Sequence, residues 1–114
     1  MKRLFISQPM RGKTDKEIEE AREAAIKLAS DLMGGDVEIL DTFFKGADLS
    51  HPLEYLGESI KRLARADVAY FAAGWESARG CKIEHECAVQ YGIPCVSVDG
   101  DLITLEGLPE VKEV

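Results

Sequence analysis

Short apolar runs and longer amphipathic segments alternate along the chain. Four of the runs are bounded by polar residues, proline or glycine, and their length and composition are typical of buried strands. These predicted strands cover residues 4–6, 37–40, 67–73 and 95–98, and residues 102–105 predict a fifth, short edge strand. The run at 67–73 is the most apolar, which predicts a central strand buried on both faces.

The segments between the strands repeat apolar residues at spacings of three and four, which predicts helices with one apolar face. They cover residues 14–33, 50–63 and 79–91. Thr14 and Glu17 form a capping-box pattern at the start of the first helix, and Gly34 with Gly35 predicts its end. Pro52 suits the first turn of the second helix.

Strands that alternate with helices predict a parallel sheet joined by right-handed crossovers, with helices on both faces. The expected fold class is α/β, a three-layer arrangement around a four- to five-stranded parallel sheet of the Rossmann- or flavodoxin-like kind. Residues 1–114 are expected to form a single domain, since this length suits one hydrophobic core. Ligands are expected beyond the carboxyl ends of the strands, where the loop 7–13, Asp41, Asp67 and the segment 75–84 are predicted to meet.

Composition and charge narrow the classes of partner. The net charge of −7 argues against a polymeric nucleic acid, because a phosphate backbone is bound by a surplus of Lys and Arg on one face. No apolar run approaches the roughly 20 residues that span a bilayer, so we expect no membrane contact and a cytoplasmic location. The three cysteines are an odd number placed inside predicted helices and strands, which favours reduced thiols.

Glu84 is the strongest candidate for a chemical role. It lies in the first turns of the third predicted helix, after a strand end and a polar loop. There the helix dipole and any nearby Arg favour the ionised carboxylate, and such a group at a cleft can attack the anomeric carbon of a sugar. The alternative is that Glu84, like Glu86, only decorates the helix surface.

The loop after the first strand holds a candidate anion site. Arg11, Gly12 and Lys13 precede a capped helix, so the free amides of the helix start and a guanidinium are placed to bind one phosphate. The segment is neither a Walker loop nor a dinucleotide fingerprint. The same residues also fit a plain turn with two solvated cations.

Three further observations leave alternatives open. Trp75, the only tryptophan, follows Gly74 at a strand end, where it would either stack on a planar base or cover the edge of the core. Asp67 is either a ligand-binding carboxylate or a residue that merely begins the central strand. Cys81 and His85 share a helical face, but the chain has no Cys-x-x-Cys pair, so neither a metal nor a cofactor is expected.

Two segments resemble known families. The first resemblance is to the nucleoside 2-deoxyribosyltransferase superfamily. It rests on residues 66–68, the apolar strand, the loop with Gly80, and Glu84 followed by Ala88 and Gly92-Ile93-Pro94. The opening Phe5-Ile6-Ser7-Gln8-Pro9-Met10-Arg11-Gly12-Lys13 is similar to the first loop of the related 2'-deoxynucleoside 5'-phosphate N-hydrolases. The resemblance covers most of residues 3–98, and the opening most closely resembles small bacterial and phage members.

The resemblance implies a nucleoside 2-deoxyribosyltransferase-like domain in which Glu84 is the nucleophile, and Asp67 holds the nucleoside and assists proton transfer to the base. It implies that Arg11 and Gly12 bind a 5'-phosphate, with Ser77 at a second phosphate-binding position. The remaining substrate-binding candidates are Ser7, Gln8, Pro9, Met10, Asp41, Trp75 and Gly80.

The implied activity is cleavage of the N-glycosidic bond of a 2'-deoxynucleoside or its 5'-monophosphate, by hydrolysis or by transfer to another base, without a metal or cofactor. The alternative is a nucleotide-binding module of the same fold without catalysis, which Glu86 favours because transferases usually carry Gly there. In both cases the partner is a small nucleoside or nucleotide. A shallow cleft in a chain of this size also predicts a homodimer or higher homo-oligomer.

Overall fold

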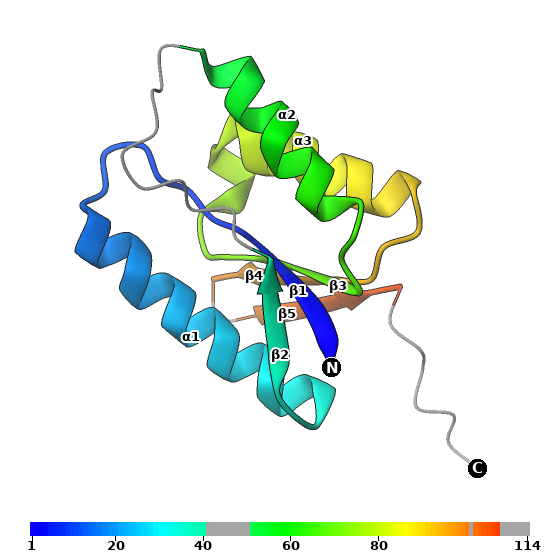
Figure 1. Cartoon of the computed structure of the whole chain (residues 1–114). Coiled ribbons are helices and arrows are strands. Elements are labelled where there is room, and N and C mark those ends of the chain that lie inside the picture. The colour runs from blue at the N-terminus through cyan, green and yellow to red at the C-terminus, as the bar shows by residue number, and fades with distance from the viewer. Residues whose placement is uncertain (41–50, 101, 108–114) are drawn as a thin grey trace.

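The computed structural model describes residues 1–40, 51–100 and 102–107. The elements within them are β1 (Lys2–Ser7), α1 (Asp15–Met33), β2 (Val37–Leu40), α2 (Pro52–Leu63), β3 (Val68–Phe71), the single 3-10 turn η1 (Trp75–Ser77), α3 (Arg79–Gln90), β4 (Cys95–Asp99) and β5 (Leu102–Glu106). Every strand and helix predicted from the sequence is present, with bounds that differ by a few residues (Figure 1).

The five strands form one mixed sheet in the order β2-β1-β3-β4-β5. The first four run parallel, and β5 pairs antiparallel to β4, so the expectation of an all-parallel sheet is wrong at this edge. Only two residues separate Asp99 from Leu102, whereas parallel neighbours need a crossover of a dozen or more, so β5 returns as a hairpin. Gly100 supplies the positive φ of 64° that suits so tight a turn.

Helices cover both faces of the sheet, which confirms the three-layer prediction (Figure 1). One face packs against α1, in a core whose buried members include Leu4, Ile6, Ala25, Ala29 and Val68. The other face packs against α2 and α3, in a core whose buried members include Phe5, Leu63, Phe71 and Ala88. β3 is buried over its whole length, as expected of a central strand. This arrangement is consistent with a Rossmann-like α/β fold.

The helix ends follow the sequence signals. Thr14 caps α1, since its hydroxyl accepts the amide of Glu17 and the Glu17 carboxylate accepts the amide of Thr14 in return. Gly34 ends α1 in the left-handed conformation, with φ 77°. Pro52 occupies the start of α2. None of the helices in the described ranges is both long and apolar enough to cross a membrane.

Thr14→Ala is expected to lower the free energy of unfolding by about 1 kcal/mol, because the amide of Glu17 loses its acceptor. Urea unfolding followed by circular dichroism measures the loss. Thr14→Ser keeps the hydroxyl and is the matched control. An equal loss in both variants would assign the effect to the methyl group and contradict the capping role.

Candidate functional site

Glu84 lies buried between the sheet and helix α2, not on the helix surface. Its residue is only 7% exposed, and it shares the inward face of α3 with Cys81 and Ala88. The Ser7 hydroxyl donates a hydrogen bond of 2.6 Å to Glu84 Oε1. The Ser59 hydroxyl of α2 acts on the same carboxyl group and lowers its pKa. One carboxylate therefore meets hydroxyls from a strand and from a neighbouring helix.

The local sequence explains why these three groups meet. Ser7 is the last residue of β1 and lies opposite Phe71 in the register with β3, at the carboxyl ends of both strands. Side chains alternate along a strand, so Ser7 points to the same face as Phe5, which packs beneath α2 and α3. Ser59 lies four residues before Leu63 on the buried face of α2 and is 3% exposed.

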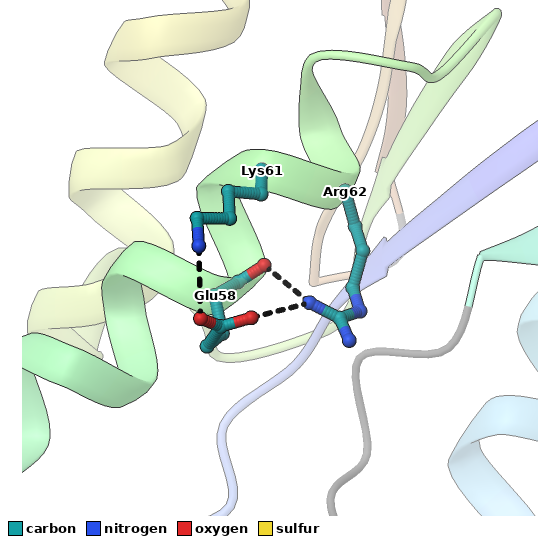
Figure 2. Close-up of polar contacts among 3 residues, drawn as sticks. All are labelled: Glu58, Lys61 and Arg62. Atoms are coloured by element: carbon teal, nitrogen blue, oxygen red, sulfur yellow. Dashed lines mark hydrogen bonds and ion pairs between the residues drawn. The ribbon is translucent and has the colours of Figure 1, made fainter.

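Ser59 is buried, whereas the charged residues next to it in α2 bind one another. Glu58, its neighbour in sequence, is exposed and contacts the side chains of Lys61 and Arg62 (Figure 2). Lys61 Nζ donates to Glu58 Oε1 at 3.1 Å, and Arg62 Nη1 donates to Oε2 at 3.1 Å. These pairs lower the pKa of Glu58, with the bond from Lys61 as the largest cause.

Burial raises the pKa of Glu84 from its ordinary value to about 7, although the Ser7 and Ser59 hydroxyls act in the opposite direction. The expectation that the helix start keeps this group ionised is wrong, because desolvation outweighs the local donors. The neighbouring Cys81 thiol has its pKa raised to about 11, also mainly by burial. Near neutral pH the site therefore holds a carboxyl group poised between its two protonation states and a neutral thiol.

The loop that follows Ser7 contacts helices α1 and α2 on either side of the sheet. Tyr55 of α2 donates its hydroxyl to Met10 Sδ at 3.5 Å, and a Cβ on Gly74 would lie 3.5 Å from Pro9 Cγ. Gln8 turns to the opposite face, where its Nε2 donates to the carbonyl of Ile18 on α1 at 3.1 Å. The loop is thus anchored to both helical layers beside Glu84.

The proposed anion-binding residues lie at the tip of this loop. The amide of Lys13 donates to the Met10 carbonyl at 3.1 Å, which closes a turn in which Gly12 takes a positive φ of 77°. Arg11, Gly12 and Lys13 are exposed. The amide of Glu17 and the amide of Thr14 are already used by the capping box, so an anion here would be bound by the turn and its cations.

Asp67 lies at the wrong end of the sheet for the role expected of it. It directly precedes β3, at the amino ends of the parallel strands, whereas Ser7 and Glu84 lie at the carboxyl ends. Its Oδ2 accepts the backbone amide of Arg3 at 2.7 Å and lies 3.4 Å from Arg3 Nε. The hydrogen bond from the backbone amide of Arg3 is the largest cause that lowers the pKa of Asp67. The expectation that Asp67 meets Glu84 is wrong, and its contacts hold the start of β3 to β1.

Trp75 packs on the protein itself. Its ring stacks on His85 with centroids 4.3 Å apart and lies 5.7 Å from the ring of Phe71. This is the alternative in which the tryptophan covers the edge of the core. Ser77, at the end of η1, is exposed, and no described contact joins it to Glu84. Gly80 lies where a Cβ would come within 3.9 Å of Leu56, so it marks the contact of α3 with α2.

The remaining expectations concern Asp41, metals and the thiols. Asp41 lies outside the described residues. In the part of the chain that the structure describes, no three His, Cys, Asp or Glu residues are grouped to hold a metal ion. The cysteines Cys81, Cys87 and Cys95 are free thiols.

Sequence reasoning missed Ser59 completely. The signal was present, because Ser59 sits between Leu56 and Leu63 on the apolar stripe of α2, where a small polar residue needs a buried partner. His85 was noted only as a metal candidate. Its Nε2 lies 3.4 Å from Glu106 Oε1 on β5. This contact joins α3 to β5, and the spacing of residues in the sequence does not predict it.

The fold and the cluster of Ser7, Ser59 and Glu84 define a small Rossmann-like α/β protein with a polar site at the carboxyl end of its sheet. The chain belongs to the family described as a domain of unknown function, DUF4406, which matches residues 2–97. The matched region includes Ser7, Ser59 and Glu84. Neither the curated proteins nor the solved structures give a significant match to the chain.

Proposed function

We propose that the protein cleaves the N-glycosidic bond of a 2'-deoxynucleoside or its 5'-monophosphate, with Glu84 as the nucleophile. The observation that carries the proposal is the buried Glu84 carboxyl group at the carboxyl end of the sheet, 7% exposed and held by the hydroxyls of Ser7 and Ser59. Parallel α/β sheets bind ligands at this end. A carboxylate held by the Ser7 hydroxyl is oriented before the substrate arrives, which favours attack in one direction.

The proposed reaction has two steps, and the same carboxylate takes part in both. An oxygen of ionised Glu84 attacks C1' of the deoxyribose, the C1'–N bond breaks, and the base leaves with the bonding electron pair and takes up a proton from water. Water then attacks C1', the ester bond to Glu84 breaks, and the carboxylate and the free sugar are released with one proton. A second base in place of water would give transfer instead of hydrolysis.

The first loop is the proposed binding segment for the sugar and its 5' end. Ser7 is already bonded to Glu84 and Pro9 packs beside Gly74, so the loop begins at the reacting group. Arg11 and the turn at Gly12 are exposed further along the same loop. The exposed cation beyond the reacting group supports a nucleotide with a 5'-phosphate over an unphosphorylated nucleoside as the ligand.

Membership of the nucleoside 2-deoxyribosyltransferase superfamily is part of the same proposal. It is supported by the Rossmann-like arrangement, by the opening loop and by the position of the carboxyl group on α3. Asp67 is left out of the proposed mechanism because its side chain is bound to Arg3 at the opposite end of the sheet.

A nucleotide-binding module without catalysis is the second candidate, and it is favoured by the raised pKa of Glu84, which leaves the group partly neutral near pH 7. A carboxyl group that is 7% exposed and whose pKa lies near 7 is in part neutral and bound to protein hydroxyls. Such a group can accept a hydrogen bond from a hydroxyl of the deoxyribose, or donate one to it, without attacking the sugar.

Incubation with a panel of deoxynucleosides and their 5'-monophosphates, with and without a free acceptor base, separates the two functions. Chromatography detects the released base, and calorimetry on the same panel detects binding. Release of base supports the enzyme, and binding without release supports the module. If no member of the panel is cleaved or bound, both proposals fail.

The rate of base release is expected to rise with pH through about 7, because the attacking group is the ionised form of a carboxyl group whose pKa is raised to about 7. Below that pH the rate should fall about tenfold per pH unit. Ser59→Ala removes a donor that lowers the pKa, so its profile should shift to higher pH. A profile that stays flat from pH 5 to 8 would contradict the role of Glu84.

A further inference from the structure

The edge strand β5 is an exposed apolar strand. Leu102, Ile103 and Leu105 are 65%, 43% and 50% exposed. Ile103 and Leu105 lie opposite Val98 and Val96 of β4, whose side chains belong to the α1 face of the sheet. Helix α1 packs over β1 and β2, at the other side of that face (Figure 1). The apolar residues of β5 are therefore left uncovered by the described helices.

The two edges of the sheet differ in how they are protected. β2, at one edge, carries the exposed Glu38 within its four residues, and a charge in the middle of an edge strand disfavours pairing with another chain. β5, at the other edge, has no Lys, Arg or Pro. Its one charged residue is Glu106, at the end of the strand, whose carboxylate faces His85 at 3.4 Å.

We propose that β5 pairs antiparallel with β5 of a second copy of the chain, so that two sheets join into one around a twofold axis at Thr104. Antiparallel pairing about such an axis puts residues that share a face opposite each other. The register centred on Thr104 pairs all five residues of the strand: Ile103 lies opposite Leu105 of the second copy, Thr104 opposite Thr104, and Leu102 opposite Glu106.

This register is complementary in polarity and charge. Both Ile103–Leu105 pairs fall on the uncovered face, where apolar cross-strand neighbours stabilise a sheet, and the Thr104–Thr104 pair falls on the other face. The chain carries a net charge of −7, so two copies repel in general. The register keeps the two Glu106 carboxylates apart by placing each beside Leu102. A single added strand pair lies at the small end of specific interfaces, below about 1,200 Å², so we expect a dimer that dissociates on dilution.

Sedimentation velocity of the full chain over a wide concentration range, with Ile103→Lys and Leu105→Glu, tests the proposal. The wild type should shift from monomer to dimer with concentration, and each variant alone should need at least tenfold more protein to do so. An equal mixture of the two variants should recover the dimer. In the mixed dimer the introduced lysine of one copy would face the introduced glutamate of the other, while the second pair keeps its native Leu105 and Ile103.

Leu32→Lys is the matched control, since Leu32 is 40% exposed on α1, far from β5 in the sheet order. It should dimerise as the wild type does. Circular dichroism checks that each variant is folded. If a charged variant does not fold, Ile103→Thr, which keeps the strand propensity, is used in its place. A wild type that stays monomeric, a chain that forms open-ended assemblies, or a mixture that fails to recover the dimer would overturn the proposal. The outcome does not depend on the proposed reaction.

Discussion

Glu84→Gln is expected to reduce the release of free base by at least roughly 10³-fold in kcat for any substrate that the wild type cleaves. The amide is similar in size and can keep hydrogen bonds to Ser7 and Ser59, but it cannot form the glycosyl ester that the proposed reaction requires. The buried position of Glu84 excludes a simple surface effect. Base release under single-turnover and steady-state conditions measures the change.

Glu86→Gln is the control for this substitution. Glu86 lies two residues further along α3, is exposed, and accepts a hydrogen bond of 3.0 Å from Gln90. It should retain wild-type activity, because it does not reach the buried cluster. A Glu84→Gln variant that keeps more than a tenth of the activity while remaining folded would show that another group is the nucleophile.

The same Glu84→Gln substitution is expected to stabilise the fold at high pH by up to about 3 kcal/mol. The pKa of Glu84 is raised from 4.5 to about 7 by burial, so the folded chain binds the proton more tightly than the unfolded chain. The contribution of Glu84 to wild-type stability is therefore greatest below pH 4.5, falls as pH rises through this window, and levels off above about pH 7. The neutral amide of the Gln variant does not lose stability as the pH rises through this window.

Urea unfolding of both proteins at several pH values measures the difference in the free energy of unfolding. The gain in the variant should be small near pH 4.5, grow up to about pH 7 and then stay constant. Glu86→Gln should show no such growth. A gain that is independent of pH would mean that packing, and not the burial of charge, separates the two proteins.

Both expectations follow from the burial of the Glu84 carboxyl group. A buried carboxyl group with so few donors destabilises the fold at the pH where it would act as a nucleophile. A buried charge is normally paired, and a buried carboxyl group without a cation partner has its pKa raised instead. The stability measurement tests this feature even before a substrate is identified.

The pattern of the sequence was sufficient for most of the architecture. The strand at 67–73 and the helix after Thr14 have strong local signals, namely a continuous apolar run and a reciprocal cap, and both are present. The direction of β5 was missed although the short connection after Asp99 already required a hairpin. Strand order and direction depend on the length of connections, which apolar periodicity does not report.

The candidate site was predicted in part. Glu84 and Ser7 come together because α3 starts at the end of the sheet where β1 finishes, and Glu84 lies in the first turns of α3 while Ser7 is the last residue of β1. Asp67 fails for the same reason, since a residue before a parallel strand lies at the opposite edge. Ser59 and the raised pKa of Glu84 depend on how α2 packs against α3, which is a tertiary contact that no single segment encodes.

Trp75 gives the protein a natural optical probe. It is the only tryptophan in the chain, and its indole is packed against Phe71 of β3 and His85 of α3. Because indole emission moves to longer wavelength in water, a red shift would report the separation of α3 from the sheet. Loosening of the helix that carries Glu84 can thus be followed by intrinsic fluorescence without any added label.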